Sequence, residues 1–66
     1  MRTQFIKIVS RSNRAYYVNM NHIVYYRYSE TEHATIIELI DGTSIYTRSS
    51  IEEISTKIEK ALVYGG

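Results

Sequence analysis

Tyrosine and arginine are the residue types in this sequence best suited to binding a ligand, and they gather in the segment YYRYSE at residues 25–30. Seven of the eight aromatic residues are tyrosines, which favour partly solvent-exposed positions because the hydroxyl needs a hydrogen-bond partner. Tyrosine rings fill protein interfaces or stack on bases, and arginines pair with phosphates. The candidates for a ligand- or partner-binding surface are Tyr17, Tyr25, Tyr26, Arg27, Tyr28, Tyr46, Arg48 and Arg14.

Three interpretations of this Tyr/Arg set stay open. The tyrosines are ordinary cross-strand pairs that stabilise a small sheet by roughly 0.2–1 kcal/mol each. Alternatively, they form a subunit interface, where tyrosine and arginine are enriched. In the third interpretation they form a ligand face for a phosphate-bearing nucleotide. The last two are compatible, since oligomers commonly build pockets between subunits.

Catalytic and metal-binding patterns are weak in this sequence. His22 and His33 belong to no HxxxH or HExxH pattern, and the sequence contains no phosphate-binding glycine loop, no GxSxG and no cysteine. The segment SETEH at residues 29–33 has acidic and histidine side chains, yet its composition favours an exposed hairpin loop. We therefore expect no enzyme, no cofactor and no metal site.

Charge is divided between the two halves of the chain, although the net charge is only +1. All seven acidic residues lie at or beyond Glu30, and the first 29 residues carry only basic ones: Arg2, Lys7, Arg11, Arg14 and Arg27. The C-terminal segment IEEISTKIEKALV carries three glutamates, so it is a poor recognition helix for DNA. Nucleic-acid contacts would have to come from the basic N-terminal hairpin.

Size favours self-association. A chain of 66 residues buries only roughly 60% of the surface that its unfolded form exposes. Small domains compensate with disulfides, a metal or association, and no cysteine is present. We expect a homodimer or higher oligomer. The absence of cysteine fits a reducing compartment, and no apolar run is long enough for a membrane span or a signal peptide, so we expect a soluble cytoplasmic protein.

Strand patterns occupy most of the chain, at about residues 4–9, 15–19, 22–28, 35–40 and 43–48. The Asp41-Gly42 turn allows two registers, and we favour a three-residue loop that places Leu39 opposite Thr43 and Ile37 opposite Ile45. Simple alternation puts Tyr25 and Arg27 on one face with Ile23, and Tyr26 and Tyr28 on the other. It also puts Tyr16 and Val18 on one face of their strand.

A helix is predicted at about residues 50–63, because Ser50 and Glu53 form a capping box and apolar residues recur at helical spacing, with Gly65 as a stop. The predicted fold is α+β, a single domain with an antiparallel meander of four or five strands and one C-terminal amphipathic helix on one face. The opposite face would be left bare, with its tyrosines available to another molecule.

A set of residues precedes the helix start, namely Tyr17, Asn19, Ile23, Thr35, Ile37, Leu39 and Gly42. With this set the chain resembles the small FlbD-like flagellar proteins over most of its length. The segments YVNMNHI and LIDGTSIYTRS also resemble the last strands of LytTR-type DNA-binding domains. The first resemblance implies regulation by protein contact and the second implies DNA contact. The small, tyrosine-rich composition is also similar in style to phage-encoded inhibitors that bind a host protein or sequester a nucleotide. Together these point to a non-enzymatic binding module.

Overall fold

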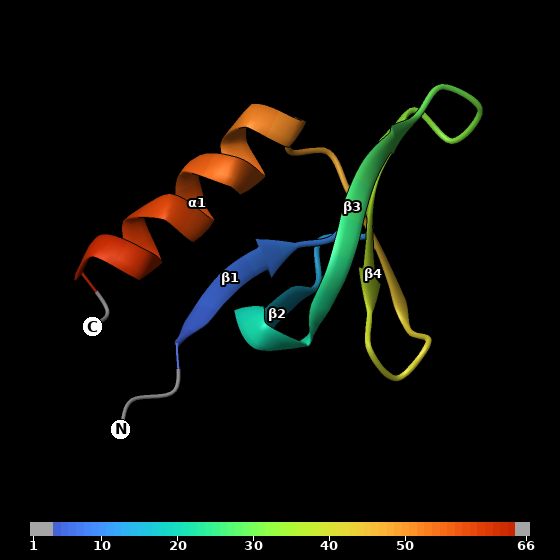
Figure 1. Cartoon of the computed structure of the whole chain (residues 1–66). Helices are drawn as coiled ribbons and strands as arrows, with labels where there is room; N and C mark the ends of the chain where they lie inside the picture. The colour runs from blue at the N-terminus through green and yellow to red at the C-terminus, as the bar shows by residue number, and fades with distance from the viewer. Residues whose placement is uncertain (1–3, 65–66) are drawn as a thin grey trace.

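Five antiparallel strands and one long helix form the part of the chain that this computed structural model describes, residues 4–64 (Figure 1). The side chains of residues 62–64 lie outside the description. In chain order the elements are β1 (Phe5–Val9), β2 (Ala15–Asn19), a short 3-10 helix η1 (Met20–His22), β3 (Ile23–Ser29), β4 (Ala34–Leu39), β5 (Ser44–Thr47) and α1 (Ile51–Tyr64). The predicted α+β class, with five strands before one helix, is confirmed.

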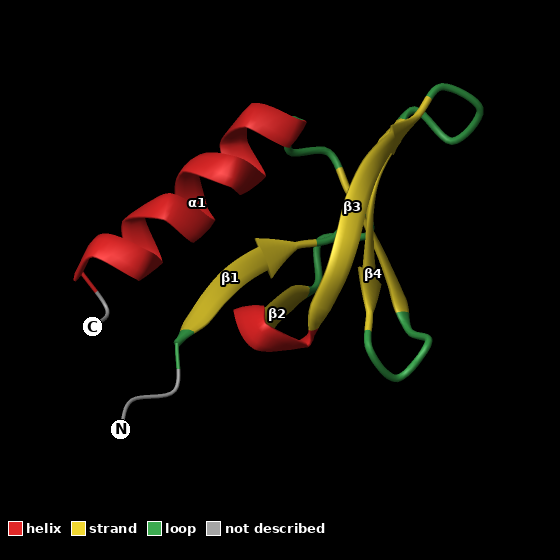
Figure 2. Ribbon diagram, in the orientation of Figure 1, coloured by secondary structure: helices red, strands yellow, loops and turns green. Residues whose placement is uncertain are grey.

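The strands form two sheets: a hairpin of β1 and β2, and a three-stranded sheet in the order β3-β4-β5 (Figure 2). The sheets meet where Ser10 bridges to Thr47 and the Arg11 N–H donates to the Tyr46 carbonyl at 2.8 Å. The buried Thr47 hydroxyl donates to the Val9 carbonyl at 2.7 Å at the same place. Main-chain hydrogen bonds therefore join the two sheets at this place, and the sheets diverge from there.

The turn between β4 and β5 has the three-residue form that the sequence favoured. The Leu39 N–H donates to the Thr43 carbonyl at 2.8 Å, and the Gly42 N–H donates to the Leu39 carbonyl at 2.9 Å. Gly42 has a φ of 90°, a conformation that a side chain would strain. Ile37 consequently pairs with Ile45, and both are buried.

A β-bulge in β3 overturns the predicted alternation at one residue. Ile23 pairs with Leu39 while Tyr25 pairs with Glu38, so Val24 is the extra residue. The bulge shifts Ile23 to the face of Tyr26, and both pack against the core. The prediction that Ile23 shares a face with Tyr25 and Arg27 is wrong, because simple alternation cannot anticipate an inserted residue.

The capping box at the start of α1 is confirmed. The Glu53 N–H donates to Ser50 Oγ at 3.1 Å, and the Ser50 N–H donates to Glu53 Oε1 at 2.7 Å. Ile54 is fully buried, and Ile58 and Ala61 pack beside it. The predicted stop at Gly65 lies outside the described residues.

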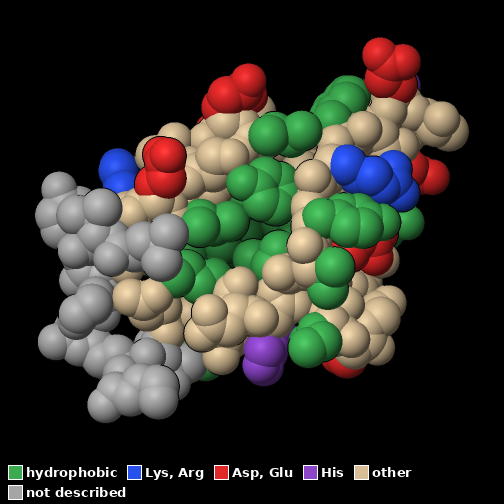
Figure 3. All heavy atoms as spheres, viewed as in Figure 1, with side chains coloured by type: hydrophobic (Ala, Val, Ile, Leu, Met, Phe, Trp, Pro, Cys, Tyr) green, Lys and Arg blue, Asp and Glu red, His purple; other side chains and the backbone are tan. Residues whose placement is uncertain are grey.

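One hydrophobic core joins both sheets and the helix. Its buried members are Ile6, Ile8, Val18, Ile37, Ile45 and Ile54. In Figure 1 the helix lies beside β1 and β3, and Figure 3 shows hydrophobic side chains gathered over the region between these elements. Each fully buried isoleucine contributes about 1.5–3 kcal/mol. The first hairpin thus shares with α1 the task of covering the inner face of the β3-β4-β5 sheet.

Candidate binding site

Tyr26 lies against the helix and is separated from the exposed tyrosines. Its hydroxyl is 2.7 Å from Ser55 Oγ, and its half-buried ring packs on the core. Tyr26, one of the predicted binding residues, therefore has a role inside the fold.

The outer face of the β3-β4-β5 sheet carries Tyr25, Arg27 and Tyr46. Arg11 from the first hairpin reaches across, with its guanidinium carbon 4.7 Å from the centre of the Tyr46 ring. The same guanidinium donates to Glu32 Oε1 and to the Glu32 carbonyl, each at 2.9 Å. Arg11 and Tyr46 are thus engaged within the molecule, and Tyr25, 52% exposed, is the more accessible ring of this face.

Tyr28 and Arg48 are the two predicted residues that line a common hollow, a groove of about 370 Å³ at the start of α1. Ser49, Ser50, Ile51 and Glu52 complete its lining. The Ser50 hydroxyl is used by the capping box, and the Glu52 carboxylate repels a phosphate. The groove therefore combines one cation with one anion.

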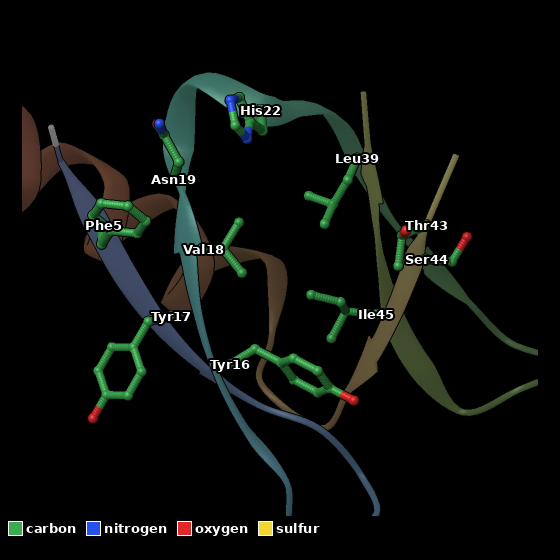
Figure 4. A pocket seen from close by; sticks show the side chains of 10 residues that line it. All are labelled: Phe5, Tyr16, Tyr17, Val18, Asn19, His22, Leu39, Thr43, Ser44 and Ile45. Atoms are coloured by element: carbon green, nitrogen blue, oxygen red, sulfur yellow. The ribbon is translucent and has the colours of Figure 1, made fainter. Parts of the chain in front are cut away.

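A second groove, of about 320 Å³, opens between β2 and β5, and we call it the aromatic groove (Figure 4). Its apolar lining is Phe5, Tyr16, Tyr17, Val18, Leu39 and Ile45. Its polar lining is Asn19, His22, Thr43 and Ser44. No lysine, arginine, aspartate or glutamate lines it, so the aromatic groove suits an uncharged, partly apolar occupant.

The rings of the aromatic groove are exposed while its floor is buried. Tyr17 is 69% exposed, Phe5 53% and Tyr16 40%, whereas Val18 and Ile45 are 7% and 5% exposed. Amphipathic rings at the rim of a buried apolar floor are typical of protein-binding surfaces. An exposed apolar patch rimmed by polar residues marks a site of contact with another molecule.

The predicted set is therefore dispersed. Tyr17 lies in the aromatic groove; Tyr28 and Arg48 lie at the helix start; Tyr25, Arg27 and Tyr46 lie on the outer sheet face; and Tyr26 lies under the helix. Arg14 is exposed beside the first turn, where its N–H donates to Ser10 Oγ at 3.2 Å.

Sequence reasoning missed Phe5, Tyr16 and His22 as groove residues. The alternation of Tyr16 and Val18 on one face was available and is confirmed by the pairing of Ile8 with Tyr16 and of Ile6 with Val18. The missing information was the position of β2 beside β5, which depends on the single bridge at Ser10.

Within residues 4–64, no group of three or more histidine, aspartate or glutamate side chains is arranged to hold a metal ion. The segment at residues 30–33 is the loop of the β3–β4 hairpin, with His33 in the left-handed conformation at a φ of 54°. The same described part of the chain has no helix with the length and apolar character needed to cross a membrane. No protein-family model, curated protein or solved structure matches the chain.

Proposed function

We propose that this chain is a non-enzymatic binding module that takes up a polypeptide segment in the aromatic groove. The observation that supports this function is the combination of exposed rings at Tyr16 and Tyr17 with a buried floor and an uncharged lining. The role is stoichiometric capture, and it agrees with the protein-contact role that the FlbD-like resemblance implies. The absence of cysteine fits action in a reducing, cytoplasmic setting.

A polypeptide is favoured over a nucleotide on grounds of charge. A nucleotide phosphate needs a cation, and the aromatic groove has none among its lining residues. Arg48 has a carboxylate beside it in the groove at the helix start. DNA contact through the first hairpin is disfavoured because Arg11 is held by Glu32.

The test is site-specific photo-crosslinking in cells. A photoreactive phenylalanine analogue replaces Tyr17 in one variant and Tyr25 in a matched control, since both rings are more than half exposed and lie on different sheets. We expect crosslinks to polypeptide from position 17 well above those from position 25. These crosslinks should respond little to salt between 50 and 200 mM, whereas phosphate-dependent capture weakens steeply over this range. Equal yields from the two positions would contradict the function.

A further inference from the structure

The outer edge of β2 presents main-chain groups most of which have no partner among residues 4–64. The Ser10 N–H donates to the Arg14 carbonyl, and the Met20 N–H donates to the Gln4 carbonyl, which identifies the bonded pairs of the β1–β2 ladder. Bonded and non-bonded pairs alternate in an antiparallel ladder, so the even-numbered residues of β2 point their N–H and C=O groups at β1. Ala15, Tyr17 and Asn19 therefore point theirs outward, and of these groups the Asn19 carbonyl already accepts the first hydrogen bond of η1.

This edge lacks the features by which sheet edges avoid pairing. Proteins protect edges with charged side chains, prolines, bulges or a covering element. The strand AYYVN has no charge, no proline and no bulge. By contrast, the other sheet has two outer strands, and both have such a feature: β3 has a bulge at Val24 and a charge at Arg27, and β5 is met by Ser10 and Arg11 of the first hairpin. The edge of β2 has none.

The aromatic groove follows this open edge. Tyr16 and Val18 line it from the inner face of β2, whereas Tyr17 and Asn19 line it from the outer face (Figure 4). Both faces of one strand line the same groove only where the groove runs along that strand's edge. A strand laid in this groove would receive hydrogen bonds from the edge and contacts from rings on both sides.

We propose that the occupant is β2 of a second copy of this chain, antiparallel to the first about a two-fold axis at Tyr17. The proposal deepens the proposed function and rests on it. In this register Tyr17 faces the second copy's Tyr17, and Ala15 faces the second copy's Asn19. The Tyr17 pair exchanges two main-chain bonds. Each of the two Ala15–Asn19 pairs makes one, from the Asn19 N–H to the Ala15 carbonyl, because the Asn19 carbonyl is engaged in η1. Four hydrogen bonds therefore join the copies into one four-stranded sheet.

The strand is self-complementary in this register. Arg14 faces the second copy's Met20 and not another arginine, so no like charges are brought together. Tyr16 faces the second copy's Val18, so each ring covers the apolar floor of the other groove. A stable pair takes about 800 Å² from each partner, and the chain exposes 4751 Å², so the interface needs about a sixth of its surface.

A single-cysteine scan tests the register, and the chain is suited to it because it has no cysteine of its own. In the proposed dimer the two copies of residue 17 are about 5.5 Å apart at Cα, within the range of a disulfide. The two copies of residue 15 are displaced by four residues along the paired strands, about 13 Å, so no disulfide can join them. Under mild oxidation we expect Y17C to form a covalent dimer, A15C to form no covalent dimer, and an equal mixture of A15C and N19C to link as a covalent heterodimer.

Charge exchange at the axis provides an independent test in the native, uncrosslinked state. Light scattering should give twice the 7.7 kDa of the chain. Y17K and Y17E should each weaken the dimer at least tenfold, because like charges would face each other, and an equal mixture should restore it. Y25K is the matched control, with an exposed ring on the other sheet, and should remain dimeric.

The proposal is wrong if the chain stays at 7.7 kDa at millimolar concentration, or if A15C links as readily as Y17C. It is also wrong if Y17K and Y25K have the same oligomeric state. Failure of the proposed function is distinguishable from these results. A monomer that still crosslinks to another polypeptide from position 17 would refute only the second copy as occupant, whereas a monomer without such crosslinks would refute both.

Discussion

The contact between Tyr26 and Ser55 is expected to support the position of the helix, and the variant Tyr26→Phe tests this directly. The change removes one hydroxyl and keeps the ring that packs on the core. The lost hydrogen bond is 2.7 Å long and partly buried. A bond between two neutral side chains contributes about 1 kcal/mol to the free energy of unfolding.

This magnitude is large for such a small protein. A chain of 66 residues has a free energy of unfolding of about 3–10 kcal/mol. Tyr26→Ala would add the loss of a half-buried ring, for a total of about 2–3 kcal/mol, and would risk unfolding the chain. A loss of binding in Tyr26→Ala would therefore report on stability, and Tyr26→Phe is the informative variant.

Urea unfolding followed by circular dichroism measures the effect. With a slope of about 1 kcal/mol per molar urea, Tyr26→Phe should lower the midpoint by about 1 M. Tyr25→Phe makes the same chemical change on the opposite, exposed face and should move the midpoint by less than about 0.5 M. A double-mutant cycle with Ser55→Ala should show coupling of about 1 kcal/mol. Additive effects, or equal shifts at positions 25 and 26, would refute this account.

Three further predictions concern the turns and caps. Arg11→Ala should lower the free energy of unfolding by about 1 kcal/mol, because the exposed ion pair with Glu32 and the stacking on a ring are lost, and 1 M salt should reduce the difference in urea midpoints. Ser50→Ala should cost about 1 kcal/mol through loss of the helix cap, seen as a lower melting temperature. The Thr43 N–H donates to Asp41 and lowers the pKa of that carboxyl below its ordinary value of 3.8. Because the pKa of Asp41 is lower in the folded state, its carboxylate stabilises the fold above pH 3.8, and this stability is lost as the pH falls through the folded pKa. The urea midpoint should therefore fall with decreasing pH below about pH 4. In Asp41→Asn this fall should be smaller.

Local interactions were the part of the fold that the sequence revealed. The register of the β4–β5 hairpin followed from matching like with like across Gly42, and the helix start followed from Ser50 and Glu53. Both depend on residues within a few positions of each other, where turn chemistry and periodicity act directly. The α+β class then followed from the order of the elements.

Long-range placement was the part that the sequence could not reveal. The bulge at Val24 depends on how β3 meets β4, and the position of Arg11 over Tyr46 depends on a contact across 35 residues. The candidate tyrosines were recognisable as a set, but the position of Tyr17 relative to the tyrosines of β3 and β5 depends on how the first hairpin meets the other sheet, in the shared core and at the bridge between Ser10 and Thr47. No local pattern encodes that bridge.

The bridge also explains why β2 is the edge left open. Beyond the bridge, the Lys7 carbonyl of β1 accepts a hydrogen bond from Lys57 Nζ at 3.0 Å, so the helix side of the first hairpin has a partner. The opposite side of the hairpin ends at β2, and there the backbone of Tyr17 meets the aromatic groove. The β1–β2 hairpin is bonded to β5 at its turn and contacts the helix along β1. The edge of β2 is therefore the one that remains available to another chain. If Y17K leaves the oligomeric state unchanged, and the photoreactive residue crosslinks no more at position 17 than at position 25, that edge has no role in binding, and the exposed rings beside it need a different explanation.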